Sequence, residues 1–523
     1  MKAFIVLALL NFIGLCEAGV DNKAANPVPL RALFWYLPDS LDPYKAGQFS
    51  LLPLARNIYA PLVSTYMDGT PQGMIAESWT VSADGRTWRF LPRKGLTFQD
   101  GTAVTAAAIV SNFRRILWLT REENQALNAL LPELKAWRRY NEPLKTLYED
   151  HGEAVFVFNK RPKNLFEAIS QPIYSIADPK CFNDRGEWLE PFCAGGSGEY
   201  LIAERTPDKI TLKARHVFKS AEKAPEIVEM LVPTAKNSSP LKLMMQGGVD
   251  LAIKTSLDVD AEFLEMVKPA GMRQRKLPAF RMNFAVLNPF RTPFSDPELR
   301  RSFRDAFQER LRADPLFTPD TRVDASFIPK GAMGYTRMPS TKRRKPVMSH
   351  AGETVTVFLN KKAANLLKKK RVLGTILSQA VVDALELHGL KLNVVDPYSV
   401  DYWGRMQKGE YDLLLHSSVI SAENPFESLR TLFMRGKLEG LPVTSGDIGA
   451  NIEKADASSD PAQRRELAEK INRAIFEEAA IVTYAHSGLV YLFNPQVDLS
   501  RCSMFLSPIE FRAVSWAPRQ GEK

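Results

Sequence analysis

The stretch "WTVSADGRTWRFLPRKGLTFQDGT" (residues 79–102) contains two Asp-Gly steps, and a third lies just upstream in "MDGT" (67–70). Asp-Gly suits the turn positions where φ is positive, and between these steps apolar residues alternate with polar ones. The pattern predicts β-hairpins. Because any β-rich protein could carry such a stretch, the surrounding sequence decides which fold the hairpins belong to.

The chain has 523 residues, which predicts two to four domains. Its composition, 45% hydrophobic and 24% charged, is typical of a soluble globular protein with a sizeable core. The net charge is +10, and basic residues cluster at 341–346 and 368–371. Such clusters can touch nucleic acid or an anionic membrane, or form a solvated face. The solvated face is favoured, and no nucleic-acid partner is expected, because neither cluster lies in a nucleic-acid-binding module.

The N-terminal sequence "MKAFIVLALLNFIGLCEAGV" has a basic start, a short apolar core and small residues at its end. This pattern predicts a secretory signal peptide over residues 1–18, cleaved after Ala18. The apolar core is shorter than the roughly 20 residues of a membrane-spanning helix. Cys16 suggests a lipoprotein, but Leu15 stands where a lipobox has a small residue, so ordinary cleavage and a soluble mature chain are expected.

Export would place the three remaining cysteines in an oxidising compartment. Cys181 and Cys193 flank "CFNDRGEWLEPFC", and Cys502 stands near the end of the chain. Three thiols allow three pairings, and three buried, reduced cysteines are the alternative. The short loop favours a disulfide between Cys181 and Cys193, which would contribute roughly 3 kcal/mol by the chain-entropy model.

The secondary-structure pattern changes along the chain. Thr105 is a suitable N-cap for a helix over 105–119, and residues 196–218 read as a hairpin. In the C-terminal half, predicted strands alternate with predicted helices, which indicates an α/β domain. The strands are expected at 354–360, 390–396 and 410–417, and the helices at 372–389 and 461–480.

Catalytic and metal-binding signatures are absent from the sequence. "GGSGE" (195–199) resembles a nucleophile elbow but lacks the second Gly at the required spacing. No phosphate-binding glycine loop occurs, and the six histidines are scattered singly without metal-ligand spacing. The sequence therefore predicts a protein that is not an enzyme and holds no cofactor or metal.

Residues 57–110, beginning "NIYAPLVSTYMDGTPQGMIAESWTVSADGRTW", resemble the signature region of the family 5 extracellular solute-binding proteins. These are the dipeptide- and oligopeptide-binding components of ABC importers. Similar segments follow the family order from about residue 30 to about residue 500, and the chain is identified as a member on that basis. They are "LDP" (41–43), "GSGEY" (196–200), "QGGVDLAI" (246–253), "MNFAVLNPFRTPFSDPELRRSFRDAF" (282–307) and "YDLLL" (411–415).

The resemblance implies an α/β fold of the periplasmic-binding-protein type, a two-lobe clamp with an extra domain and mixed sheets flanked by helices. Lobe I would combine residues 19–60, 181–275 and 486–523, the extra domain would be 61–180, and lobe II would be 276–485. A solute that touches both lobes would favour the closed form. Inner-membrane permease subunits with their ATPases would recognise that form, and no bond would be made or broken.

One departure from the family concerns the contact with the ligand's amine. Peptide-binding members carry Gly-Trp after the Tyr-Asp strand and, three residues beyond the Trp, an Asp that pairs with the α-ammonium. Alignment places Ser417 and Ser418 at the Gly-Trp and Ser421 at the Asp. A hydroxyl cannot replace a desolvated carboxylate there. Either Glu423 takes that role or the ligand has no free amine at this point, and the second alternative is favoured.

The same alignment gives further candidate ligand contacts. One group follows the "LDP" element in a stretch that lines the ligand in relatives, one residue falls among the cleft tyrosines of the family, and two offer aromatic surface. For each, core packing or ordinary surface is an equal alternative. The candidates are Gly47, Gln48, Phe49, His486, Tyr402 and Trp403.

The sequence as a whole predicts a monomeric periplasmic binding protein that delivers peptides or peptide-like solutes to an ABC permease. The departure at Ser421 keeps open a different solute, such as a metal chelate or a glycoside. A sensor or chaperone-like protein that has kept the fold without a transporter is the other alternative.

Overall fold

The computed structural model describes most of the chain. The predicted signal peptide and the Asp-Gly step at 68–69 lie outside the described residues, as do 341–343 and 368–371 of the basic clusters. The described residues are 28–34, 37–38, 40–47, 51–65, 70–121, 127, 131–162, 165–218, 223–232, 240–255, 265, 267–314, 323–339, 344–358, 373–395, 405–406, 408–420, 424–434, 441, 446–458, 460–502 and 509–516.

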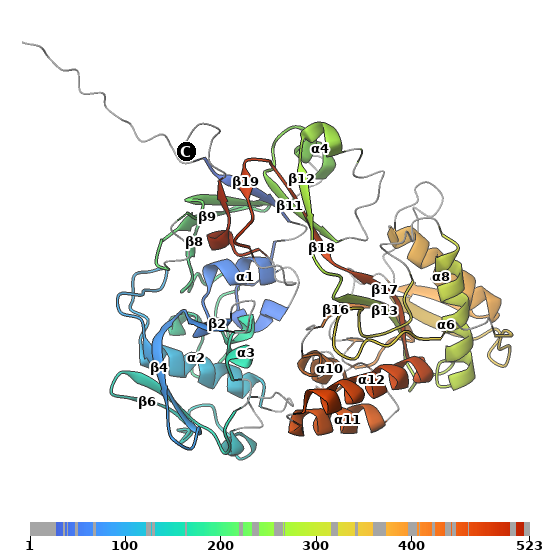
Figure 1. Ribbon diagram of the computed structural model, residues 1–523, viewed down its shortest axis with the longest axis horizontal. Coiled ribbons are helices and arrows are strands. Elements are labelled where there is room, and N and C mark those ends of the chain that lie inside the picture. The colour runs from blue at the N-terminus through green and yellow to red at the C-terminus, as the bar shows by residue number, and fades with distance from the viewer. Residues whose placement is uncertain are drawn as a thin grey trace, which may run out of the picture.

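A seven-stranded mixed sheet lies at the top of Figure 1, with strand order β12-β18-β11-β1-β10-β9-β8. The central strand β1 runs parallel to β10 and β11, and the remaining pairs are antiparallel. The sheet therefore contains both a strand from near the start of the chain, β1, and a strand from near its end, β18. Its strands are β1 (Leu30–Leu33), β8 (Tyr200–Arg205), β9 (Lys209–Ala214), β10 (Ile227–Leu231), β11 (Leu251–Thr255), β12 (Arg273–Lys276) and β18 (Leu489–Phe493).

Short helices and loops cover this sheet. The 3-10 helix η1 (Pro43–Gly47) leads towards α1 (Leu52–Ile58), and α4 (Pro240–Met245) precedes β11. A two-stranded ribbon of β19 (Val497–Asp498) and β20 (Ser515–Trp516) lies near the C-terminus. Apolar residues of α1 and of the C-terminal segment pack with the sheet into one core, which includes Leu54, Tyr59, Tyr200, Tyr491 and Phe511. Met244 of α4 packs with Val490 and Leu492 in a second, smaller core.

The opening stretch of the sequence forms part of a four-stranded antiparallel sheet with order β4-β5-β7-β6. Its strands are β4 (Ala76–Val81), β5 (Thr87–Pro92), β6 (Leu147–Asp150) and β7 (Glu153–Val157). The predicted hairpin is confirmed: β4 pairs with β5 across a turn in which Gly85 has φ +71° and Asp84 Oδ1 accepts from the Arg86 N–H at 3.0 Å. The Asp side chain and the free φ of Gly thus build the turn together.

Helix α2 (Ala106–Leu119) packs on the four-stranded sheet, and the Thr105 hydroxyl caps it by accepting from the Ala108 N–H at 3.2 Å, as predicted. Phe113 on this helix meets Phe156 on β7 edge to face, with ring centroids 4.9 Å apart. The region also contains α3 (Leu165–Ile169) and the strand pair β2 (Val63–Thr65) and β3 (Pro71–Gly73). It lies at the lower left of Figure 1.

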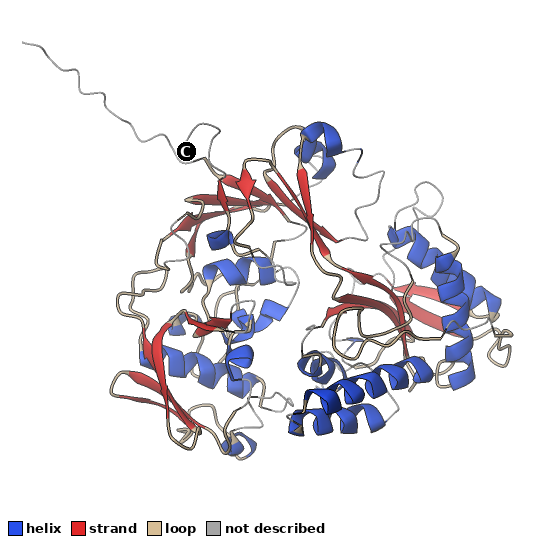
Figure 2. Cartoon of the chain, in the orientation of Figure 1, coloured by secondary structure: helices blue, strands red, loops and turns tan. Residues whose placement is uncertain are grey.

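A five-stranded sheet, on the right in Figure 1, has the order β15-β14-β16-β13-β17. The two faces of this sheet carry separate cores and different helices, which Figure 2 shows as layers. Its strands are β13 (Arg281–Leu287), β14 (Thr354–Phe358), β15 (Lys391–Val395), β16 (Leu413–Val419) and β17 (Ile481–Ser487). One face packs on α6 (Pro297–Arg312) and α8 (Leu373–Leu387), and the other on α10 (Phe426–Phe433), α11 (Gly446–Ala457) and α12 (Pro461–Glu478).

Two of these helices begin with the same Asp-Pro signal. Asp296 accepts from the Glu298 N–H at 2.8 Å at the start of α6, and Asp460 accepts from the Ala462 N–H at 2.9 Å at the start of α12. In each helix a Pro follows at the first helical position, where its missing N–H is not needed. Among the described residues, no helix has the length and apolar character to cross a membrane.

Candidate functional site

Two short connections carry the backbone from the seven-stranded sheet to the five-stranded sheet. Gly488 alone separates β17 from β18, and residues 277–280 separate β12 from β13. The Leu277 N–H donates to the Leu489 carbonyl at 2.8 Å, so the two connections run side by side. Figure 1 shows β17 and β13 continuing into β18 and β12 at this crossover.

The crossover requires a glycine at position 488. A Cβ atom there would lie 2.2 Å from the Leu277 carbonyl oxygen and 2.8 Å from that of Pro278. Both distances are shorter than carbon and oxygen tolerate without bonding, so any side chain would push the two connections apart. Close backbone approach is one of the reasons for which glycine is used.

Polar side chains gather on one face of the five-stranded sheet beside the crossover. We call this group the crossover polar face: Arg281 and Asn283 of β13, Ser417 of β16 and Ser487 of β17. Arg281 Nη1 donates to Ser417 Oγ at 3.1 Å, and Asn283 Nδ2 donates to Ser487 Oγ at 3.0 Å. Asn283 pairs with Ser417 across the β13–β16 register, which places their side chains on the same side of the sheet.

Burial governs the titration of Arg281 on this face and of His416 on the opposite face, where His416 pairs with Phe284. Desolvation lowers the pKa of the Arg281 guanidinium from its ordinary value. His416, which precedes Ser417 in β16, has its pKa lowered to about 4 by burial and, secondarily, by the Arg281 charge. The imidazole is therefore neutral at neutral pH.

His486 and Ser418 lie on the opposite face, where both pair with Met282 in the sheet register. His486 is 8% exposed, and its Nε2 lies 3.0 Å from the Ser326 carbonyl oxygen. Its Nδ1 lies 3.7 Å from Asp324 Oδ2. Burial lowers the pKa of His486, although the Asp324 carboxylate acts in the other direction. These contacts tie His486 to the loop that packs beneath the sheet.

The predicted contact residues thus fall in different places. Ser417 belongs to the crossover polar face, whereas Ser418 and His486 lie on the other side of the same sheet. Gly47 is the last residue of η1. The other candidates lie outside the described residues: Gln48, Phe49, Tyr402, Trp403, Ser421 and Glu423.

Arg281 was missed by the sequence reasoning. It opens the strand "RMNFAVL", six residues of which are buried. A cation at the start of so apolar a strand was the signal that could have marked it, because buried charges persist where they have partners or a function.

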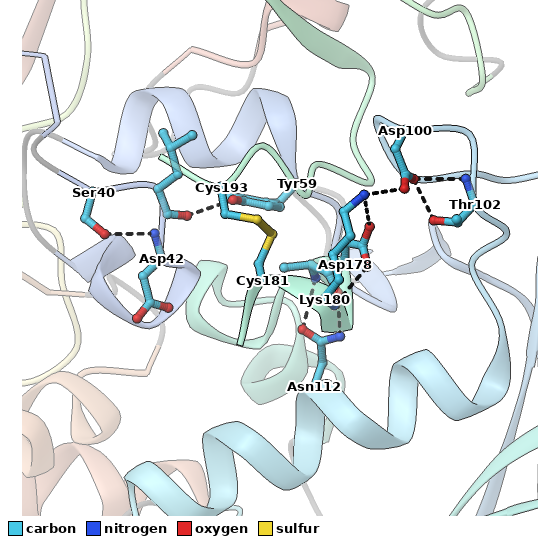
Figure 3. The surroundings of a disulfide bond; sticks show 12 residues. Ser40, Asp42, Tyr59, Asp100, Thr102, Asn112, Asp178, Lys180, Cys181 and Cys193 are labelled. Atoms are coloured by element: carbon cyan, nitrogen blue, oxygen red, sulfur yellow. Dashed lines mark hydrogen bonds and ion pairs between the residues drawn. A yellow bond between two sulfur atoms is a disulfide. The ribbon is translucent and has the colours of Figure 1, made fainter. Parts of the chain in front are cut away.

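The segment that contains η1 is held by the loop between Cys181 and Cys193. These cysteines form a disulfide with their Cα atoms 5.6 Å apart, while Cys502 is buried and reduced. The Leu41 N–H donates to the Pro191 carbonyl inside the loop at 2.6 Å. The Tyr59 hydroxyl donates to the Leu41 carbonyl at 2.7 Å (Figure 3).

Arg115 of α2 connects the same loop to Asp42. Its Nη1 and Nη2 donate to the two Asp42 carboxylate oxygens, each at 2.8 Å, and its Nε donates to the Gly186 carbonyl at 2.8 Å. The guanidinium carbon lies 5.3 Å and 5.2 Å from the ring centroids of Phe182 and Trp188. The disulfide loop, α2 and the start of η1 are therefore one packed unit.

Comparison with known proteins gives consistent matches over most of the chain. Residues 70–438 match the model of bacterial extracellular solute-binding proteins, family 5 Middle. A probable di/tripeptide-binding protein 5 of Pseudomonas aeruginosa is 24% identical over 82% of this chain and 84% of that protein. The periplasmic oligopeptide-binding protein OppA of Escherichia coli is 20% identical over 88% of this chain and 87% of that protein.

Solved structures of low sequence identity share the fold. Haemophilus influenzae OppA, in complex with the peptide RPPGFSPFR, superposes with a TM-score of 0.74 at 15% identity, covering 94% of this chain and all of that one. NikA from Brucella suis, in complex with Fe(III)-EDTA, has a TM-score of 0.69 at 17% identity, covering 93% and 99%. The predicted α/β fold class is confirmed, and the chain belongs to the family 5 bacterial extracellular solute-binding proteins.

Proposed function

We propose that this protein is the periplasmic solute-binding component of an ABC importer and that it captures peptides or peptide-like solutes. The observation that carries the proposal is the crossover: two sheets with separate cores meet through Gly488 and residues 277–280, in a chain of this family. Curated relatives bear the names of di/tripeptide- and oligopeptide-binding proteins, which supports the solute class.

The crossover explains how binding would be coupled to shape. A turn of one sheet relative to the other needs backbone changes only at the two short connections, while both cores keep their packing. A solute that contacts the parts built on both sheets would bind the closed arrangement more tightly than the open one. Binding would therefore raise the fraction of closed protein, by an amount set by that difference in affinity. Permease subunits would then receive the closed, loaded form. The solute would be released unchanged.

The ligand contacts that we propose begin with the crossover polar face. Ser417 is the aligned position that lies there, and Arg281 adds a cation beside it at 3.1 Å. A guanidinium recognises carboxylates through paired hydrogen bonds. We infer that this end of the site receives an acidic group of the solute. We propose Gly47, Gln48 and Phe49 as contacts from the part of the chain that carries the seven-stranded sheet.

Ser421 stands where peptide-binding relatives carry an Asp, and the lack of a carboxylate there limits the range of solutes that we expect to bind. A free α-ammonium buried against a hydroxyl would keep an uncompensated charge. We therefore expect free di- and tripeptides to bind weakly, and amine-blocked or amine-free acidic solutes to bind better. Glu423 is the alternative partner, and Tyr402 and Trp403 remain proposed aromatic contacts. A metal chelate is the second candidate solute, because NikA, with the same fold, has been solved with Fe(III)-EDTA.

Calorimetry with solute-free protein tests the proposal. The protein is unfolded, dialysed and refolded to remove any solute carried through purification, and is then titrated with free peptides, N-acetylated peptides and metal chelates. Micromolar or tighter binding of an acidic, amine-free solute, with compaction in X-ray scattering, is the expected result. Tight binding of free peptides that Glu423→Gln does not weaken would contradict the amine argument. A library that produces neither heat nor compaction would contradict the function itself.

A further inference from the structure

The motif "GSGEY" (196–200) lies away from the crossover, and its glycines fit against the end of α1. A Cβ atom on Gly196 would lie 2.5 Å from the Ile58 carbonyl oxygen, and one on Gly198 would lie 2.6 Å from the Ile58 carbonyl carbon. The Ser197 hydroxyl, between them, donates to the Ile176 carbonyl. The motif therefore presses its backbone against α1, and this contact fixes the position of Glu199.

Glu199 is a buried carboxylate with one oxygen accounted for. The side chain is 3% exposed, and its Oε2 accepts from the Phe218 N–H at 3.1 Å. Its Oε1 is buried and has no partner at hydrogen-bond distance among the described residues. The backbone N–H groups of His216 and Arg215 also act on this carboxylate and lower its pKa, although burial has the larger effect. Burial raises the pKa of this carboxyl group. A buried acceptor without a donor is rare in native proteins, so Glu199 Oε1 calls for a partner.

Arg56 of α1 presents the complementary problem. Its Nη1 lies 3.5 Å from Glu510 Oε1, and Arg512 holds the other oxygen of Glu510 through its Nη2 at 2.6 Å. The Nε of Arg56 is buried, and no acceptor for it lies among the described residues. One buried donor and one buried acceptor are thus unsatisfied near the same end of α1.

Both residues line a single cavity of about 30 Å³. The cavity lies between α1 with the GSGEY motif on one side and residues of the four-stranded region on the other, where Ser64, Ser170 and Ser175 contribute. A cavity needs about 10–15 Å³ on this measure, with two to four polar partners, to hold a water molecule. The volume therefore suits one or two water molecules and excludes a larger ligand.

We propose that this cavity is an internal hydration site, in which ordered water donates to Glu199 Oε1 and accepts from Arg56 Nε. Two arginines and two glutamates line the cavity, so neither a cation nor an anion gains a net attraction there. Water can act as donor and acceptor at once and satisfies both groups. The GSGEY motif then has a structural role. It positions the Glu199 carboxylate, which binds this water where α1 contacts the four-stranded region.

Two measurements on the full mature chain test the proposal without any solute. A crystal structure that resolves ordered water should show density within hydrogen-bond distance of Glu199 Oε1 and Arg56 Nε. Water-oxygen magnetic relaxation dispersion should show a long-lived internal water. Glu199→Gln keeps an acceptor at Oε1 and should retain the water, whereas Glu199→Met should lose it and melt at a lower temperature than the Gln variant.

Three outcomes would overturn the proposal: a dry cavity, side chains rearranged so that both atoms bond to protein groups, or density with the short contacts of a metal ion. If the Met variant fails to fold, density and relaxation of the wild-type protein still decide between these outcomes. None of these results depends on whether the protein binds peptides.

Discussion

Arg115 and Asp42 form an ion pair with two hydrogen bonds of 2.8 Å, in which the side chains are only 4% and 6% exposed. The residues are 73 positions apart, one on α2 and the other just before η1. Parallel hydrogen bonds between a guanidinium and a carboxylate are strong and geometrically specific. The pair therefore fixes the four-stranded region against the first residues of the seven-stranded body.

The first prediction concerns this pair. Arg115→Met should destabilise the protein by about 3–5 kcal/mol, because it leaves the Asp42 charge buried without its partner. Denaturation by urea measures the loss. The matched control is Arg86→Met, since Arg86 and Asp84 form a pair whose side chains are 52% and 50% exposed. Exposed pairs contribute about 0–1 kcal/mol, so the control should change stability little.

A double variant separates the charge from packing. Adding Asp42→Leu to Arg115→Met removes both members of the pair, so much of the lost stability should return. If the double variant loses as much free energy of unfolding as the Arg115→Met and Asp42→Leu variants lose in total, the ion pair does not cause the loss of stability. The stacking of Arg115 on Phe182 and Trp188 would then explain the loss.

The second prediction concerns the disulfide loop. Replacing Cys181 and Cys193 by Ser should lower the free energy of unfolding by roughly 3 kcal/mol. It should also raise hydrogen exchange at the Leu41 amide, because the acceptor of that amide is Pro191 in the loop. Mass spectrometry of peptides covering residues 40–47 measures the exchange. Cys502→Ala, at the reduced cysteine, should leave that exchange unchanged, and equal exchange in all three proteins would contradict the prediction.

The third prediction concerns the crossover. Gly488→Ala places a methyl group 2.2 Å from the Leu277 carbonyl oxygen. The two connections must separate, so we expect a loss of about 1–3 kcal/mol and an altered balance of compact and extended forms in X-ray scattering. Gly446→Ala is the control, because a Cβ atom there meets nothing within 4 Å. Identical scattering and stability for the two variants would remove the steric argument for glycine at 488.

The fourth prediction concerns the solute. Arg281→Gln should weaken binding of an acidic solute by roughly 10- to 100-fold, the range for a lost hydrogen bond to a charged group. Calorimetry measures the dissociation constant. Ser418→Ala is the control, because Ser418 lies on the opposite face of the sheet and should not change affinity. Weaker binding in the control and unchanged binding in the Gln variant would place the solute on the other face.

The fifth prediction concerns pH. Burial and the nearby Arg281 depress the pKa of His416 to about 4 in the folded protein, against about 6.5 in the unfolded chain. Between these values the unfolded state binds a proton that the folded state does not, so stability should fall as pH drops from 6.5 towards 4. The lost contribution is up to about 3 kcal/mol.

Unfolding measured at several pH values tests this dependence. His416→Asn should flatten it over that interval. His151→Asn, at a side chain that is 90% exposed, should leave it as in the wild-type protein. Equal stability of the wild-type protein at pH 6.5 and pH 4.5 would contradict a depressed pKa for His416 in the folded protein.

Features that depend on neighbours in the chain could be predicted from sequence. The Asp84-Gly85 turn and the Thr105 cap each involve residues a few positions apart, so residue type alone specifies the local geometry. The sequence did not predict helix α11, because it contains Gly446 and Gly449 and glycine is a poor helix former.

The remainder of the site depends on contacts between distant residues. Gly488 is required because the carbonyl oxygen of Leu277, more than two hundred positions earlier, lies 2.2 Å from the place that a Cβ atom would occupy. Ser417 and Ser418 are adjacent in sequence but lie on opposite faces, because alternate residues of a strand point to opposite sides. A sequence alignment therefore assigns both serines to the ligand site, whereas the strand pairing in the structure puts them on different sides of the sheet.

The position of β18 bears on when the protein can fold. This strand lies between β11 and β12 inside the seven-stranded sheet, and β17, just before it, completes the five-stranded sheet. A nascent chain that ends before Ile481 has β12 cut off from the rest of its sheet and β13 lacking one neighbour. Neither of these two sheets can be finished until the ribosome has made nearly the whole polypeptide, whereas the four-stranded sheet, whose last strand β7 ends at Val157, can form much earlier.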